Sequence, residues 1–177
     1  RLLAARNDIV YSISCTTRKP RGDEVDGRDY FFLSEERFDA DVKAGRFLEH
    51  AVVHGQKYGT PRKMVEDAMR AGRSVIMDID VQGATQIRNY AKMLPSDDLL
   101  ARGYVDIFIS PPSMQALRER LERRGEDAPE EMERRLRNAE GEMKWRNEYQ
   151  YVVVNDDIDR AYTELKEIVE NEAKKKE

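Results

Sequence analysis

Short apolar runs rich in β-branched residues alternate with helical patterns along most of this chain, and this alternation restricts the fold more than any other feature. The runs cover residues 9–13, 74–79, 105–109 and 151–154. Each is typical of a buried strand, because it is largely apolar and too short for an ordinary helix. Since strands that alternate with helices pair in parallel, the pattern predicts an α/β fold, with a parallel sheet flanked by helices on both faces.

Four amphipathic helices are predicted between and after these runs. They cover residues 61–71 and 113–125 and begin near residues 129 and 159. Ser113 is a favourable N-cap and Pro129 a favourable first residue, whereas Gly72 and Gly125 are placed to end the first two helices. These helices supply the cover that a buried parallel sheet needs.

Residues 28–60 depart from the alternation. They contain two β-rich runs, 30–33 and 47–53, on either side of a short amphipathic helix at 35–44. We interpret this segment as a small inserted subdomain of mixed β structure. The predicted division is a core at 1–27 and 61–112, the subdomain at 28–60, helices with flanks at 113–146, and a last strand and helix at 147–177.

Size and composition exclude several classes of protein. A chain of 177 residues with 40% apolar residues fits one domain with a smaller subdomain or lid. The net charge of −4 argues against general nucleic-acid binding, and no stretch is long enough to cross a membrane. The single cysteine, Cys15, is compatible with the reducing cytoplasm and is interpreted as a packed side chain, not a nucleophile. One cysteine and two histidines make no zinc site.

The segment Ser12–Arg21 (SISCTTRKPR) brings hydroxyls and two guanidiniums close together. An arginine fork fits two phosphate oxygens at once, and serine or threonine hydroxyls can donate to the others. Pro20 restrains the loop between Arg18 and Arg21. The segment therefore predicts a phosphate site, with a solvated arginine-rich loop as the alternative.

Asp78 and Asp80 lie at the end of the run 74–79, at the expected carboxyl edge of a parallel strand, where ligands bind. The strand period of two would put both carboxylates on one face. Two acids so close need compensation, which magnesium with a nucleotide phosphate or the N–H groups of a guanine ring would supply. The alternative is a pair of acids that cap a helix.

Six arginines crowd the two helices predicted at 113–125 and from 129. Glutamates at helical spacing give several of them ordinary surface partners. Two arginines on a helix–turn–helix can also close over a polyphosphate as a lid, and phosphoryl transfer depends on such positioned charge. The six are Arg120, Arg123, Arg124, Arg134, Arg135 and Arg137.

Four side chains in the inserted segment suggest a pocket: Tyr30, Glu49, Tyr58 and Thr60. Tyrosine hydroxyls can hold a phosphate, and a glutamate accepts from the amino or imino groups of a base. Each of the four also fits a half-buried position in a sheet.

Six segments in order resemble the guanylate kinase family, whose members transfer a phosphoryl group from ATP to GMP. The resemblance extends over nearly the whole chain and implies the P-loop nucleoside monophosphate kinase fold. It also implies Mg²⁺ with ATP, no nucleic-acid or membrane partner, and a cytoplasmic monomer or homodimer. The segments are SISCTTRKPR (12–21), EVDGRDYFF (24–32), FLEHAVVHGQKYGT (47–60), DIDVQG (78–83), the arginine-rich helices and VVNDD (153–157).

The resemblance implies a role for individual residues. The GMP phosphate would contact Ser14, Arg18, Arg21, Tyr30 and Tyr58, and the guanine ring would contact Glu49, Thr60 and Asp80. Asp78 would lie near magnesium, Asn155 near the adenine, and Arg120, Arg124 and Arg135 would reach the transferred phosphate from the lid. The other three lid arginines keep the surface interpretation. Guanine suits Glu49, because its N1–H and amino group both donate where adenine presents an acceptor at N1.

The sequence departs from the family in two places. The glycine-rich phosphate loop would come before Arg1, since residues 1–7 are typical of the end of the helix that follows it. A chain without that loop is expected to bind GMP but transfer phosphate poorly, so the alternative function is an inactive module that binds GMP or phosphopeptides. Residues 87–104 exceed the usual length and are interpreted as a surface insertion.

Overall fold

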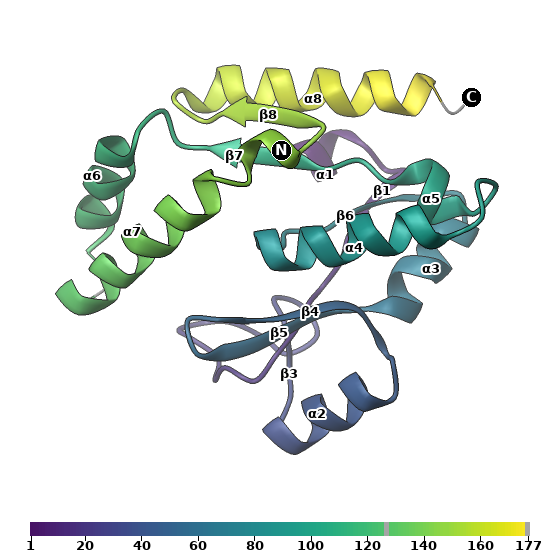
Figure 1. Cartoon of the computed structure of the whole chain (residues 1–177), viewed down its shortest axis with the longest axis horizontal. Coiled ribbons are helices and arrows are strands. Elements are labelled where there is room, and N and C mark those ends of the chain that lie inside the picture. Colours follow the sequence, from purple (N-terminus) through teal and green to yellow (C-terminus); the bar gives the residue numbers. More distant parts are fainter. Residues whose placement is uncertain (126–127, 176–177) are drawn as a thin grey trace. The chain divides into compact units, whose positions relative to one another are not determined.

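The computed structural model describes residues 1–125 and 128–175, which divide into two compact units, Arg1–Tyr104 and Val105–Glu177. We call them unit 1 and unit 2. Parallel strand pairs and helices occur in both units (Figure 1). The predicted α/β class is therefore confirmed.

Unit 1 has helices around a parallel strand pair and a mixed sheet. The pair joins β1 to β6, with Ile9 opposite Ser74 and Tyr11 opposite Ile76, so each predicted run forms a strand shorter than itself. In chain order the elements are α1 (Leu2–Ala5), β1 (Ile9–Tyr11), β2 (Cys15–Thr16), β3 (Phe31–Phe32), α2 (Glu35–Lys43), β4 (Phe47–Val53), β5 (Gln56–Pro61), α3 (Arg62–Arg70), β6 (Ser74–Ile76), α4 (Val81–Met93) and α5 (Leu99–Gly103).

The mixed sheet has the strand order β3-β2-β5-β4. β4 and β5 form an antiparallel hairpin, whose turn holds His54 and Gly55 in the left-handed region, with φ of 51° and 79°. Positive φ at both turn residues matches the twist of the two strands. Because β2 pairs with β5 antiparallel and with β3 in parallel, the sheet joins strands from both sides of the loop at 17–30.

Helix α2 covers the mixed sheet through Phe38, which is 1% exposed and stacks on Phe47 with 4.7 Å between ring centroids. Cys15 packs in the same apolar cluster. Burial raises the pKa of the Cys15 thiol to about 11, so the thiol is protonated at neutral pH. The interpretation of Cys15 as a packed side chain is confirmed.

Residues 87–104 do not form a surface insertion. Ile87 of α4 is fully buried and packs against Val65 of α3. Leu100 and Tyr104 pack against the same cluster. The prediction was wrong because the extra length is folded into α4 and α5, whose apolar side chains complete the core of unit 1.

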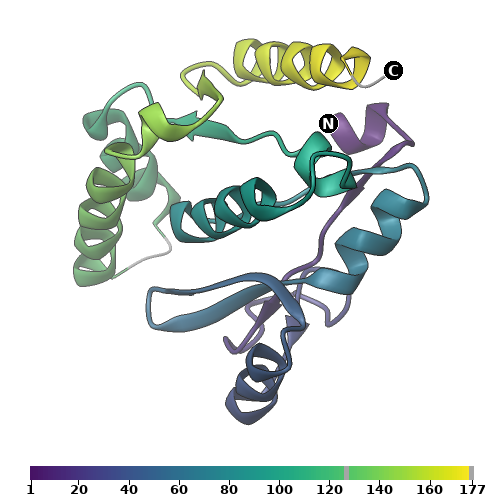
Figure 2. The ribbon, with the colours of Figure 1, turned by 45° about the vertical axis from the view of Figure 1, so that its right-hand side comes forward.

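Unit 2 is built on the parallel pair of β7 and β8, which runs from Ile107 opposite Tyr151 to Ser110 opposite Val154. Helix α8 lies along β8 (Figure 1), and Figure 2 shows the helix over its whole length up to the C-terminus. No helix in the described ranges is long and apolar enough to span a membrane. The elements are β7 (Ile107–Ser110), α6 (Met114–Arg124), α7 (Pro129–Met143), the 3₁₀ helix η1 (Arg146–Glu148), β8 (Tyr151–Val154) and α8 (Ile158–Lys174).

The arginine-rich helices of unit 2 begin and end as the sequence predicts. Ser113 Oγ accepts the N–H of Ala116 at 3.1 Å, and Gly125 ends α6 with φ of 66°. Pro129 is the first residue of α7. The predicted turn between these helices includes residues 126–127, which lie outside the described residues.

Candidate functional site

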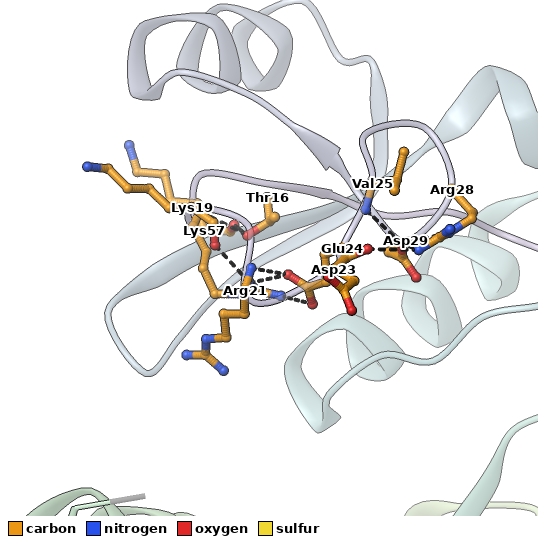
Figure 3. Close-up of polar contacts among 10 residues, drawn as sticks. Thr16, Lys19, Arg21, Asp23, Glu24, Val25, Arg28, Asp29 and Lys57 are labelled. Carbon is orange, nitrogen blue, oxygen red and sulfur yellow. Dashed lines mark hydrogen bonds and ion pairs between the residues drawn. The ribbon is translucent and has the colours of Figure 1, made fainter. Parts of the chain in front are cut away.

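Arg18, in the loop after β2, is held by the carboxylate of Glu24. Its Nη1 and Nη2 donate to the two Glu24 oxygens at 2.7 and 2.9 Å, and Nη1 also donates to the Lys19 carbonyl at 2.8 Å. Glu24 accepts the N–H of Arg21 at 2.7 Å as well (Figure 3). These hydrogen bonds lower the pKa of Glu24 to about 2, and the bond to Glu24 raises the pKa of Arg18. Both groups are therefore charged at neutral pH.

Aromatic rings line the Arg18 guanidinium. Its Cζ lies 5.0 Å from the ring centroid of Tyr30 and 5.9 Å from that of Phe32, within the range of cation–π attraction. The rings of Tyr30 and Tyr58 meet edge to face at 6.0 Å, and a hydrogen bond with Tyr58 also raises the pKa of Arg18. The structure thus brings together three of the five predicted phosphate ligands.

The other two predicted phosphate ligands belong to the same segment. Ser14 directly precedes β2, and its carbonyl accepts the N–H of Phe31 at 2.9 Å, next to Tyr30. Arg21 is tied by its backbone to Glu24, and its side chain is exposed. Ser14 therefore lies just before β2, Arg18, Arg21 and Tyr30 lie in the loop at 17–30, and Tyr58 lies on β5.

Glu49 of β4 is a buried carboxylate, 4% exposed. Its Oε1 accepts the hydroxyl of Thr60, the residue opposite it on β5, at 2.5 Å. Burial raises the pKa of Glu49, the Thr60 hydrogen bond opposes this rise, and the charge of Asp80 adds to it. A carboxylate has lone pairs for several donors, so Glu49 can accept N–H groups in addition to the Thr60 hydroxyl.

Asp80 begins helix α4 instead of ending a strand. β6 ends at Ile76, and Asp80 is the N-cap of α4, where Oδ1 accepts the N–H of Gly83 at 2.9 Å. The prediction that Asp78 and Asp80 share one face of a strand was wrong, because the strand ends before either residue. The alternative of a helix cap is confirmed for Asp80.

Gly83 leaves room for the Glu49 carboxylate. A Cβ at Gly83 would lie 2.5 Å from Glu49 Oε2, closer than real Cβ contacts allow. Gln86, one turn further along α4, fixes the helix to β4, since its amide donates to the His50 carbonyl at 2.7 Å and accepts the His50 N–H at 3.2 Å. Sequence reasoning missed both residues. A glycine in the first turn of a helix, where alanine is more stable, is the signal that could have found Gly83.

Asp78 is exposed between β6 and α4. Its charge helps to raise the pKa values of Tyr11, at the end of β1, and of Tyr30, so Asp78 lies near one of the predicted phosphate ligands. Within residues 1–125 and 128–175, no three His, Cys, Asp or Glu side chains come together to hold a metal ion. Magnesium that arrives with a nucleotide needs only one or two carboxylates, because phosphates and waters fill its other positions, and Asp78 fits that need.

The predicted lid arginines lie on α6 and α7 of unit 2. Arg120 Nη2 donates to the Asp156 carbonyl at 3.3 Å. Arg135 Nε lies 3.6 Å from a carboxylate oxygen of Glu131, and Arg124 is exposed in the last turn of α6. All three are thus on the two helices where the sequence expects them.

Asn155 follows β8, and its N–H donates to the Ser110 carbonyl at 2.8 Å, which continues the β7–β8 ladder. Asp156, whose carbonyl Arg120 contacts, is the next residue. The predicted adenine-side residue and one lid arginine therefore meet at the same end of β8.

Arg118 holds the two arginine-rich helices of unit 2 together, a role that sequence reasoning missed. Its Nη1 donates to Glu133 of α7 at 2.6 Å. The two residues are 15 positions apart and lie on different helices, so no helical spacing in the sequence indicates that they pair. Arg134, interpreted from the sequence as a surface residue, pairs with Glu131 on its own helix at 2.5 Å.

Comparison with known proteins identifies the family. A model of the guanylate kinase family matches residues 2–172. A guanylate kinase of Wolbachia pipientis wMel is 43% identical over 176 residues, which cover 99% of this chain and 83% of that protein. A guanylate kinase of Rhizobium meliloti is 46% identical over 171 residues, which cover 97% of this chain and 74% of that protein. The crystal structure of guanylate kinase from Anaplasma phagocytophilum aligns with a TM-score of 0.76 at 36% identity, covering 94% of this chain and 77% of that one. The chain belongs to the guanylate kinase family.

Proposed function

We propose that unit 1 binds GMP while the chain carries out the reaction of its family, the transfer of the γ-phosphoryl group of ATP to GMP. The observation that carries this proposal is the pairing of two unlike subsites in unit 1. One is a guanidinium lined by tyrosines, and the other is a buried carboxylate beside a threonine hydroxyl. A nucleoside monophosphate offers a dianionic phosphate to the first and a base to the second.

At the phosphate end, Arg18 would supply the main charge-assisted contact. Its guanidinium is already oriented by Glu24 and lined by Tyr30, so little side-chain freedom is lost on binding. The Ser14 hydroxyl, the Arg21 guanidinium and the hydroxyls of Tyr30 and Tyr58 would donate to the remaining phosphate oxygens.

At the base end, Glu49 would select guanine. Its carboxylate accepts N1–H and amino hydrogens, whereas adenine at the same place would face it with an unprotonated N1 and leave a buried acceptor unpaired. Thr60 holds one oxygen of that carboxylate. Asp80 is the N-cap of α4, and its carboxylate accepts the N–H of Gly83. This carboxylate would add a second acceptor for the base.

In unit 2, Arg120, Arg124 and Arg135 would stabilise negative charge on the transferred phosphoryl group, and Asn155 would lie by the adenine. Magnesium bound with ATP neutralises phosphate charge, and Asp78 is the residue of unit 1 that would hold it, through its carboxylate. Because phosphoryl transfer relies on positioned charge, the arginines would act on the rate more than on GMP affinity.

The alternative of an inactive binding module is not favoured, because the matched relatives over nearly the whole chain are guanylate kinases. We further propose that the chain works in the cytoplasm as a monomer or homodimer. The division into a core, a GMP-binding subdomain at 28–60 and a lid at 113–146 stays a proposal as well.

The test measures binding and turnover separately. Calorimetry should give tighter binding of GMP than of AMP, and a coupled assay of ADP release should respond to GMP in the presence of ATP and magnesium. Absence of GMP binding to the folded chain would remove the proposed site from unit 1.

Arg135→Ala provides the matching test of unit 2. We expect it to lower kcat by about a hundredfold or more with little change in the Kd of GMP. The reason is that Arg135 would stabilise the negative charge of the transferred phosphoryl group and would not contact GMP in the binding step. An equal loss in both quantities would contradict the lid role.

A further inference from the structure

The phosphate side of unit 1 contains a buried donor that the chain itself leaves unsatisfied. The Nε of Arg18 is fully buried and has no hydrogen-bond partner among the described residues. Buried N–H groups are nearly always paired, so an exception at a proposed binding site calls for an acceptor from outside the chain. Nη1 and Nη2 of the same guanidinium both have partners, which makes the exception local to the Nε edge.

Glu24 and Lys19 account for the other edge of the guanidinium. The two Glu24 oxygens accept from Nη1 and Nη2, in the end-on geometry of a bidentate pair. The second Nη1 hydrogen goes to the Lys19 carbonyl. The Nε–H of the side-on edge remains without a partner, and this edge, completed by the outer hydrogen of Nη2, is suited to two oxygens of one phosphate group. Tyr58, whose hydrogen bond also raises the pKa of Arg18, contacts the same guanidinium.

We propose that Glu24 is a positioning residue of the phosphate site: it binds the end-on edge of Arg18 and thereby presents the side-on edge to the GMP phosphate. This rests on the proposed function, in which Arg18 is a phosphate ligand. Glu24 does not touch the nucleotide. It acts by fixing the direction of the guanidinium.

The loop holds Glu24 firmly enough for this role. The carboxylate also accepts the N–H of Arg21, and the N–H of Glu24 donates to the Arg21 carbonyl at 3.1 Å. The next turn is closed by Asp29, which accepts from the N–H of Val25 and from Arg28 (Figure 3). Glu24 is thus bonded through backbone and side chain in the same short loop.

Two other roles for Glu24 make different predictions. If Glu24 were an internal substitute for phosphate that GMP must displace, removal of its charge would strengthen GMP binding. If it only stabilised the loop, its removal would weaken GMP binding whether or not Arg18 is present. A positioning role requires that the effect of Glu24 pass through Arg18, so the two residues should be strongly non-additive.

The experiment is a double-mutant cycle on Glu24→Gln and Arg18→Ala, read by calorimetric titration with GMP and with guanosine. We expect Glu24→Gln to weaken GMP binding about tenfold and to leave guanosine binding unchanged, because Glu24 acts only on the arginine that contacts the phosphate, which guanosine lacks. In the Arg18→Ala background, Glu24→Gln should change GMP binding by less than about twofold.

Two further variants guard against loss of structure. Glu66→Gln removes another glutamate of unit 1 that pairs with arginines, Arg62 and Arg70, and should leave GMP binding unchanged. Glu24→Asp keeps the charge on a shorter side chain and should bind GMP more tightly than Glu24→Gln. Circular dichroism melting establishes that each variant is folded.

The outcomes separate this proposal from the proposed function. If Arg18→Ala leaves GMP affinity unchanged, the phosphate site itself is wrong. If Arg18→Ala weakens GMP binding but Glu24→Gln does not, the site stands and the positioning role of Glu24 is overturned. Tighter GMP binding by Glu24→Gln, or an equal loss in both Arg18 backgrounds, would overturn it too.

Discussion

Two glutamates of unit 1 differ in what surrounds their carboxylates. Glu24 lies in an irregular loop, and its pKa falls to about 2 because the Arg18 side chain and the Arg21 N–H donate to it. Glu49 lies on a strand, is 4% exposed, and its pKa rises because burial outweighs the hydrogen bond from Thr60. The donors around Glu24 stabilise its charged form, whereas burial away from water destabilises the charged form of Glu49.

One small unit thus prepares two chemically different subsites. A phosphate needs a cation whose direction is fixed, which a charged partner such as Glu24 provides. Recognition of a base needs acceptors for its N–H groups. A buried carboxylate such as Glu49 is a selective acceptor, because leaving it unpaired costs free energy that a matching base removes. A substitution at either carboxylate or its partners changes one subsite and leaves the other in place.

The largest effect on binding is expected for Arg18→Ala. We expect the free energy of GMP binding to weaken by about 1.5–3 kcal/mol, the usual worth of a charged hydrogen-bonded contact, while guanosine affinity stays the same. Calorimetric titration measures both. Arg70→Ala is the control, because it removes an exposed arginine of unit 1 that pairs with Glu66 on its own helix. Equal losses for GMP and guanosine would place Arg18 at the base instead.

Gly83→Ala acts on the base side. The new methyl group would meet Glu49 Oε2 at 2.5 Å, so the buried carboxylate must move. We expect a loss of about 1–3 kcal/mol in the free energy of unfolding, as for overpacked cores, together with weaker GMP binding. Urea denaturation and titration measure these two quantities.

Gly141→Ala is the matched control, because Gly141 lies inside α7 with nothing within 4 Å of an added Cβ. This change should stabilise the helix by about 0.5–1 kcal/mol. Destabilisation of the same size in both variants would mean that the contact between Gly83 and Glu49 is not the cause.

Glu49→Gln should reduce the preference for GMP over AMP by about tenfold, because an amide can donate to adenine as well as accept. Competition binding of the two nucleotides measures the ratio. The hydrogen bond with Thr60 can survive, since the amide oxygen still accepts. An unchanged ratio would mean that guanine is recognised elsewhere.

The same variant tests the raised pKa of Glu49. The pKa of Glu49 is higher in the folded chain than its ordinary value of 4.5 in the unfolded chain. The charged carboxylate therefore makes folding less favourable as the pH rises from 4.5 through the raised pKa. Glu49→Gln should therefore melt a few degrees above the original chain at pH 7, and this advantage should disappear below pH 4.5. Melting curves across this range check the sign.

The smallest effect is expected for Glu24→Gln on stability. Because the pKa of Glu24 is lowered to about 2, its contribution to stability is present above its ordinary value of 4.5 and is lost as pH falls toward 2. Over that window the melting temperature of the variant should fall less steeply than that of the original chain. Parallel slopes would show that the pair with Arg18 does not stabilise the fold.

Strands and helix ends could be predicted from sequence where local signals suffice. The β-branched run at 151–154 forms β8, and Ser113, Gly125 and Pro129 cap or begin helices as predicted, because these preferences act within a few residues. The end of β6 was placed too late. Nothing local in residues 74–79 marks the point after Ile76 where pairing with β1 stops.

The composition of the candidate site could also be predicted, since Arg18, Tyr30 and Tyr58 lie together and Glu49 contacts Thr60. The supports of the site could not. Glu24 matters because an irregular loop folds back onto Arg18, and Gly83 because α4 packs against β4. Neither contact joins residues at a helical or strand spacing, so no pattern in the sequence indicates it.

The order of the amino acids specifies the alternation that makes an α/β fold and the chemical groups the protein has, namely arginines and hydroxyls for a phosphate and carboxylates for a base. What each group can do depends on how the chain folds. A carboxylate's pKa depends on solvent and on neighbouring donors, and these come from residues far apart in the chain. For this reason Glu24 and Glu49, chemically identical in the sequence, are opposites in the folded protein.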